Sequence, residues 1–158
     1  MHDPHPTNGP AAPQTAHVAG FDAARATLPD GRAVLVLSYD PTGPHGLACD
    51  AHGLRDALAA APADVVVFRP RGADLEALLD AASACDRAHP VMATAAPVTD
   101  AVKRISGPLV VATVARTRLA WAVGPGVVDA ATLQAHLPSV AGATVWPLTA
   151  AGGRVTWL

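Results

Sequence analysis

Three short apolar runs, separated by two helical patterns, constrain the fold of this chain more than any other feature. The runs are residues 33–37 (AVLVL), 64–68 (DVVVF) and 91–95 (VMATA). Continuous apolar runs of this length are typical of strands buried on both faces of a parallel sheet. Residues 51–61 and 73–87, between the runs, carry leucines at the spacing of an amphipathic helix. The order strand, helix, strand, helix, strand predicts right-handed crossovers and an α/β fold.

Aspartates mark the starts of two of the helices. Asp50 precedes residues 51–61, and Asp129 precedes residues 130–137, where a third helix is expected. A carboxylate in this position accepts hydrogen bonds from the free amides of the first helical turn. The remaining expected elements are a short helix over residues 21–28, a turn at Gly124-Pro125-Gly126, and strands over 109–114, 143–148 and 154–158. Pro147 indicates that the strand over 143–148 lies at a sheet edge.

The chain divides into a tail and one domain. Residues 1–20 are rich in Pro, His, Ala and Gly. This composition buries too little apolar area to offset the entropy of ordering, so we expect a flexible tail. Residues 21–158 are expected to form a single α/β domain, because 158 residues are enough to bury one core.

The charge balance argues against several classes of function. The chain has 11 Lys and Arg residues against 13 Asp and Glu residues, so it offers no basic field for nucleic acid or a membrane surface. No apolar run approaches the ~20 residues of a membrane span, and the N-terminus has no secretion-signal pattern. We therefore expect a cytoplasmic protein in which Cys49 and Cys85 are reduced, buried thiols.

Polar groups follow each of the three apolar runs. After the first, Asp40, Thr42 and His45 could line a pocket or form a Pro/Gly turn with a capping aspartate. After the second, Arg69 and Arg71 could hold a phosphate or form a solvated rim.

The third group lies in residues 97–105 (PVTDAVKRI). It contains the only lysine of the chain, Lys103, together with Thr99 and Asp100. Polar residues where strands leave a core often carry function, although a turn cap and a solvated face would also explain them.

Residues 97–105 resemble a loop of the methylerythritol phosphate cytidylyltransferases, whose pattern is roughly P-V-x-D-T-x-K; Ala101 stands at the family's second threonine. The likeness extends over about residues 33–137. ADVVVFRP resembles the strand that ends in H-D-A-A-R-P, TVARTRLAWAVGPG resembles T-V-D-R-x-x-L-x-x-x-x-T-P-Q, and VVDAATLQAHL resembles the helix that follows.

The resemblance implies a fold, a partner and a site. The fold would be a three-layer, mostly parallel, Rossmann-like sheet of the nucleotidyltransferase type, N-terminally truncated so that the chain joins it at about the second strand. Residues 99–116 would form a β-arm that crosses to a second subunit, giving a homodimer. Arg116 stands at the arginine that binds substrate phosphate, and Thr99, Asp100 and Lys103 stand in the substrate-binding loop, so a sugar phosphate or CTP is an expected ligand.

The departures from the family fall on its chemistry. Nothing in this sequence resembles the glycine-rich loop that holds the CTP triphosphate. Phe68-Arg69-Pro70 replaces the aspartate that helps to hold magnesium, and Gly124 replaces the threonine of T-P-Q. A second lysine is absent. Cytidylyl transfer needs these charges, so we expect no catalytic residues and no cofactor, with Mg²⁺ required only if the protein is active.

Three hypotheses follow. The first is a catalytically inactive relative that binds a phosphorylated ligand or a partner. The second is an active enzyme in which Arg69, Arg71 and Lys103 replace the missing loop and Asp40 or Asp100 holds the metal. The third is a small α/β interaction module that resembles the family by accident.

Overall fold

The computed structural model describes residues 16–18, 20–42, 49–140, 142–145 and 155–157. The strands are β1 (Ala16–Val18), β2 (Phe21–Thr27), β3 (Ala33–Tyr39), β4 (Cys49–Asp50), β5 (Val65–Pro70), β6 (Val91–Pro97), β7 (Val102–Ser106), β8 (Leu109–Val114), β9 (Ala120–Asp129), β10 (Thr144–Val145) and β11 (Val155–Trp157). The helices are α1 (Ala51–Ala60), α2 (Leu75–Ala84), the 3₁₀ turn η1 (Arg116–Arg118) and α3 (Ala130–His136).

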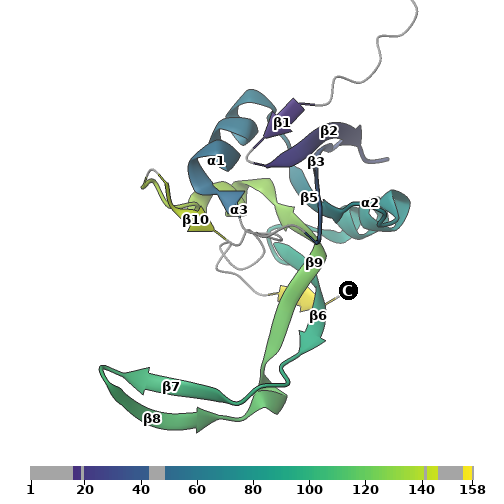
Figure 1. Cartoon of the computed structure of the whole chain (residues 1–158). Coiled ribbons are helices and arrows are strands. Elements are labelled where there is room, and N and C mark those ends of the chain that lie inside the picture. The colour runs from purple at the N-terminus through teal and green to yellow at the C-terminus, as the bar shows by residue number, and fades with distance from the viewer. Residues whose placement is uncertain (1–15, 19, 43–48, 141, 146–154, 158) are drawn as a thin grey trace, which may run out of the picture.

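Seven strands form one mixed sheet in the order β1-β2-β3-β5-β9-β6-β11 (Figure 1). The strand β3 is parallel to β5, as the apolar runs predict, and β6 is also parallel to β11. However, β9 lies between β5 and β6 and runs antiparallel to both, and β2 runs antiparallel to β3. The fold is therefore α/β with a mixed sheet. The prediction of a mostly parallel sheet is wrong, because four of the six strand pairings are antiparallel.

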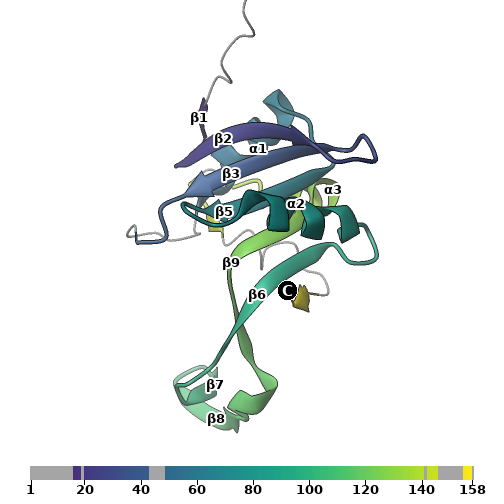
Figure 2. The same ribbon diagram turned by 90° about the vertical axis from the view of Figure 1, so that its right-hand side faces the viewer.

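Helices cover both faces of the sheet, so the expected three layers are present (Figures 1 and 2). Alternate residues of each strand point to opposite faces. On one face, Leu35 and Leu37 of β3 lie in the same buried cluster as Leu54 of α1 and Leu133 of α3. On the other face, the core contains Leu78 and Ala82 of α2, packed with Val34, Val36, Val65 and Val67.

The predicted helix caps are confirmed. The Asp50 carboxylate accepts hydrogen bonds from the amides of His52 and Gly53, and the Asp129 carboxylate accepts one from the amide of Thr132. Each bond satisfies an amide that has no partner within its own helix.

Two local predictions are wrong. Residues 21–27 form the strand β2, and the expected helix over 21–28 is absent. Phe21 and Ala23 point into the core, and the strand pairs with β3 from Asp22 opposite Ser38 onward. Ala and Arg are good helix formers, but helix propensity is a small energy per residue, and this cross-strand pairing outweighs it. Gly124-Pro125-Gly126 is likewise not a turn but part of β9, at an irregularity in its pairing with β6.

Other predictions fall partly outside the described residues. Most of the expected tail, residues 1–15 and 19, lies outside them, whereas Ala16–Val18 of that stretch forms β1. Pro147 and half of the expected strand over 143–148 are also outside, and its described part contains β10, which pairs with β4 in a separate small sheet.

Two further sequence predictions concern the thiols and the membrane. Cys49 and Cys85 are free and buried, and burial raises the pKa of each thiol to about 12. Within the described part of the chain, no helix is long and apolar enough to cross a bilayer.

Arg32 holds the end of α2 through contacts that are distant in sequence. Its guanidinium donates hydrogen bonds to the carbonyl oxygens of Cys85 (2.6 Å) and Ser83 (2.7 Å) and pairs with the Asp30 carboxylate (2.7 Å). The last carbonyls of a helix lack partners within it and carry partial negative charge, so a cation is favourable there. Arg32 thereby links the turn before β3 to the end of α2.

We predict that Arg32→Lys lowers the free energy of unfolding by about 2 kcal/mol, because a single ammonium cannot replace the planar fork that reaches two carbonyls and a carboxylate. Urea denaturation measures the change. Arg25→Lys is the matched control, since Arg25 is exposed on β2, and it should shift stability by no more than about 0.5 kcal/mol. Equal effects of the two substitutions would contradict the capping role.

Candidate functional site

The most distinctive feature of the molecule is an arm that projects from the sheet (Figures 1 and 2). We call residues 94–123 the arm. Its root is a two-stranded ribbon in which Thr94 pairs with Val123 and Pro97 with Ala120. Its outer part is the hairpin β7–β8, in which Val102 pairs with Val114. The predicted arm over residues 99–116 corresponds to the outer part of this projection.

The hairpin exposes apolar side chains. We call Ile105, Leu109, Val110 and Val111 the tip patch; their exposed fractions are 65%, 66%, 63% and 48%. Ile105 lies opposite Val110 across the hairpin, and Leu109 and Val111 flank Val110 along β8. Branched apolar side chains left in water are unfavourable, and groups of them typically mark interaction sites.

The tip patch was not predicted from the sequence. Residues 109–114 were expected to form a strand, and the resemblance placed them in the arm, but their exposure was not foreseen. The Ser106-Gly107-Pro108 turn, with Gly107 at φ 57°, was the signal that two short strands form a hairpin of their own.

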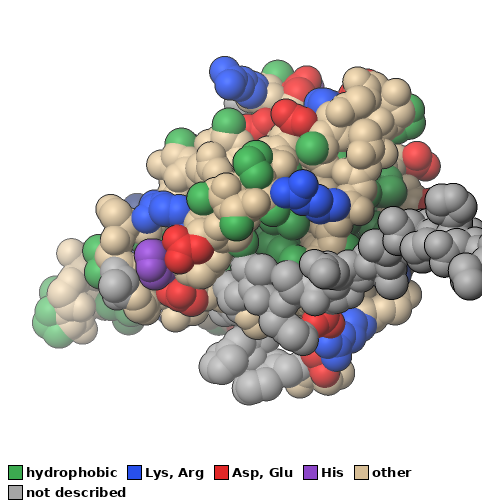
Figure 3. Space-filling model, turned by 90° about the horizontal axis from the view of Figure 1, so that it is seen from above, with side chains coloured by type: hydrophobic (Ala, Val, Ile, Leu, Met, Phe, Trp, Pro, Cys, Tyr) green, Lys and Arg blue, Asp and Glu red, His purple; other side chains and the backbone are tan. Residues whose placement is uncertain are grey.

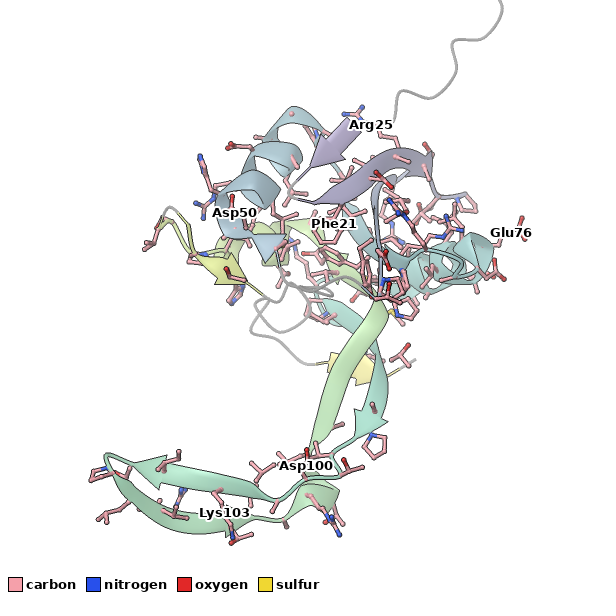
Figure 4. The ribbon with its side chains drawn as sticks, in the orientation of Figure 1. Phe21, Arg25, Asp50, Glu76, Asp100 and Lys103 are labelled. Carbon is pink, nitrogen blue, oxygen red and sulfur yellow. The ribbon has the colours of Figure 1, made fainter. Side chains whose placement is uncertain are left out.

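The four predicted substrate-binding residues lie in and next to this arm. Arg116 begins η1, and its guanidinium Nη1 donates to the backbone oxygen of Thr99 at 2.6 Å. The structure therefore brings Thr99 and Arg116 together across the base of the hairpin. Asp100 follows Thr99 in an exposed turn, as Figure 4 shows.

Lys103 lies further along the hairpin, on β7. Its Nζ donates to Thr113 Oγ1 at 2.6 Å, which ties the two strands of the hairpin together. The Lys103 cation faces a hydroxyl and the Arg116 cation a carbonyl, so neither charge is neutralised by a carboxylate within these contacts. Both cations keep capacity for an anion.

One side of the arm is hollowed by an open depression of about 530 Å³. Arg104 supplies the guanidinium at this surface, and apolar side chains make up most of the rest. The lining residues are Arg104, Ala112, Thr113, Val114, Ala115 and Leu119.

The polar groups at the carboxyl ends of β3 and β5 are engaged with their own chain. Asp40 accepts hydrogen bonds from the hydroxyl (2.7 Å) and the amide (2.9 Å) of Thr42, and these bonds lower the pKa of the Asp40 carboxyl. The alternative of a capped turn is thus the correct one for Asp40 and Thr42, while His45 lies outside the described residues.

The two arginines after the second apolar run also have partners. Arg69 Nε donates to the carbonyl oxygen of Ala73 at 2.8 Å, and Arg71 pairs with the Asp22 carboxylate at 2.6 Å. From above, basic and acidic side chains are interspersed on the visible face and do not form a field of one sign (Figure 3).

The described residues do not fit a magnesium site. Asp40 uses one carboxylate oxygen for both bonds to Thr42, and Asp100 lies on the arm, away from the core. Among the described side chains, no group of three or more His, Cys, Asp and Glu residues is placed to hold a metal ion. Mg²⁺ is usually bound by one or two carboxylates together with waters and substrate phosphates, and Asp40 and Asp100, one after β3 and one on the arm, do not form a carboxylate pair within one chain.

Comparison with known proteins gives distant structural likenesses. The structure is similar to the methylerythritol phosphate cytidylyltransferases. No protein-family model and no curated protein matches the chain. A 4-diphosphocytidyl-2C-methyl-D-erythritol synthase is 23% identical with a TM-score of 0.44, over 68% of this chain and 56% of that one. This chain therefore spans about half the length of that protein.

Two other structures give similar values. The 2-C-methyl-D-erythritol 4-phosphate cytidylyltransferase of Thermus thermophilus is 18% identical with a TM-score of 0.42, over 78% of this chain and 70% of that one. The bifunctional IspDF of Campylobacter jejuni is 17% identical with a TM-score of 0.45, over 68% of this chain and 29% of that one.

We predict that Arg116→Gln loosens the base of the hairpin. Without the guanidinium, the bond to the Thr99 carbonyl that closes residues 99–116 is lost, so the amides of residues 99–102 and 116–119 should exchange with deuterium several-fold faster. Hydrogen-exchange mass spectrometry measures this. Arg104→Gln removes an exposed arm guanidinium that does not make this bond, and it should leave the exchange unchanged. Protection that is equal in both variants would contradict the role of Arg116.

Proposed function

We propose that this protein is a non-catalytic, cytidylyltransferase-like module that forms a homodimer through its arm and binds a phosphorylated ligand near Arg116 and Lys103. The observation that carries the proposal is the tip patch on a projecting arm. A hairpin held away from the core gains little packing from its own chain, as the exposure of its apolar side chains illustrates. Burial against a second copy would remove the patch from water.

A second copy of this chain is the occupant that we favour. The arm carries Lys103, Arg104, Arg116 and Arg118, four of the 11 basic residues of the sequence, but only Asp100 of the 13 acidic ones. The rest of the chain is accordingly acidic. The basic arm of one copy is therefore complementary in charge to the acidic remainder of a second copy.

The ligand part of the proposal depends on two cations. Lys103 and Arg116 contact a neutral hydroxyl and a carbonyl, both of which an anionic oxygen can replace or supplement. A phosphate group binds guanidinium in a bidentate manner and ammonium as a point charge. A sugar phosphate and CTP are the ligands that the sequence resemblance implies for these positions.

Catalysis is the less supported alternative. It requires Arg69, Arg71 and Lys103 to converge on a triphosphate, and Asp40 or Asp100 to hold a metal. Arg69 and Arg71 are bound to Ala73 and Asp22 at the end of β5, whereas Lys103 lies on the arm. Losing a single preorganised electrostatic contact costs a factor of about 10²–10³ in rate, so a site whose groups are this dispersed is poorly suited to cytidylyl transfer. An interaction module unrelated to the family remains the third candidate.

We predict that Val110→Asp weakens dimerisation by at least about tenfold, because a charge would be buried at the centre of the contact. Analytical ultracentrifugation over a concentration series measures the dissociation constant. The matched control is Val140→Asp. Val140 is 69% exposed, close to the 63% of Val110, but follows α3 in the chain and is not one of the arm residues. A monomeric wild-type protein would overturn the dimer proposal, as would equal effects of the two substitutions.

We further predict that calorimetric titrations will detect binding of a sugar phosphate but not of CTP. A sugar phosphate should bind to the wild-type protein and lose most of its affinity in Arg116→Ala, while CTP with Mg²⁺ should release no binding heat. CTP binding would favour the active-enzyme alternative and would justify an assay for pyrophosphate release. Binding of neither compound would remove the ligand part of the proposal and leave the dimer part standing.

A further inference from the structure

The phenol of Tyr39 lies directly against the backbone of Gly124. Tyr39 ends β3 and is only 6% exposed. A Cβ atom built on Gly124 would lie 1.7 Å from the phenol oxygen and 2.9 Å from Cζ of the ring. Carbon and oxygen atoms that are not bonded approach each other to roughly 3.0–3.5 Å, so any side chain at position 124 would collide with Tyr39. The two residues fit only because one of them has no side chain.

Gly124 is placed where the arm leaves the sheet. In the pairing of β6 with β9, Ala93 lies opposite Gly126 but Thr94 lies opposite Val123. Gly124 and Pro125 are therefore the extra residues of a bulge. Bulges bend the strand that contains them and increase its twist. The Thr94 hydroxyl donates to the Pro125 carbonyl at 3.5 Å across this bulge.

Tyr39 is itself held by an aromatic cluster. Its ring packs edge-on against Phe21, with centroids 6.1 Å apart and an interplanar angle of 82°. Phe21 packs in turn on Phe68 at 5.8 Å. Phe21 and Phe68 are 2% and 0% exposed, so the Tyr39 ring is backed by side chains that have no room to move.

We infer that Tyr39 is the positioning residue of the arm: its phenol oxygen, held against the Gly124 bulge, fixes the direction in which the arm leaves the core. The inference concerns a single chain and goes beyond the proposed dimerisation. Both β6 and β9 run from the sheet into the ribbon, and β9 carries the bulge. Movement of the bulge changes the direction of the ribbon, and the contact with Tyr39 restricts that movement from the side of β3. The direction of the arm in turn decides where the tip patch meets a partner.

The test measures the distance between the arm and the core. Spin labels at Ser106→Cys on the hairpin and Ala59→Cys on α1 report this distance by pulsed electron resonance, since both positions are exposed. The native thiols are buried and remain unlabelled. Labelled chains are mixed with an excess of unlabelled chains, so only pairs within one chain contribute, whether or not a dimer forms.

Two single variants and their combination give the decisive comparison. Tyr39→Phe removes only the oxygen that faces Gly124 and should broaden the distance distribution. Gly124→Ala inserts a methyl group into the place of that oxygen and should shift the mean distance by more than the width of the wild-type distribution. In the double variant, the 1.7 Å overlap with the oxygen is gone and only the 2.9 Å contact with Cζ of the ring remains, so the displacement should be smaller than in Gly124→Ala alone.

A matched control is Ala95→Ser, which adds one atom at an exposed position of the same ribbon and should leave the distribution unchanged. Circular dichroism and thermal melting select variants that are folded. Unchanged distances in folded Tyr39→Phe and Gly124→Ala would overturn the inference, and so would a double variant whose displacement is the sum of the two single ones. A monomeric wild-type protein would refute the proposed dimer and leave this result intact.

Discussion

The pairing of β9 with both β5 and β6 is the interaction on which the rest of the structure depends. Val127 and Val128 of β9 are fully buried, one toward each face of the sheet, and they contribute to both cores. The same strand continues beyond the sheet as one half of the arm. A single strand therefore lies between two parallel pairs, β3-β5 and β6-β11, and continues into the arm, so the arm is connected directly to the core of the sheet.

The core buries its apolar side chains, whereas the arm leaves apolar side chains exposed. In the core, valines and leucines alternate between two layers of helices and are removed from water. In the arm, the same kinds of side chain stay exposed and the polar contacts are local, such as Lys103 with Thr113. The core buries its apolar side chains within one chain, whereas the outer arm is stabilised mainly by the hydrogen bonds between β7 and β8. This contrast is the reason for seeking the function of the chain on the arm.

Polar contacts between distant segments join the elements into one body. Arg32 connects the turn before β3 to the end of α2, Arg55 donates to the Leu137 carbonyl at the end of α3, and Arg71 connects the end of β5 to Asp22 of β2. Two of these arginines satisfy carbonyls at a helix end, where the chain needs a donor and the helix dipole favours a cation. These arginines are consequently poor candidates for binding an external phosphate.

The sequence by itself determined the buried strands, the three helices and the aspartate caps of two of them, because these depend on local periodicity and on hydrogen bonds within a few residues. It also located the arm and its polar residues through resemblance. Tertiary structure decided the rest. Residues 21–28 became a strand because pairing with β3 outweighed a weak helical preference, and β9 entered between β5 and β6 because only long-range pairing chooses neighbours in a sheet. The contact of Tyr39 with Gly124, and the exposure of the tip patch, arise from packing between residues distant in sequence, on which local pattern carries no information.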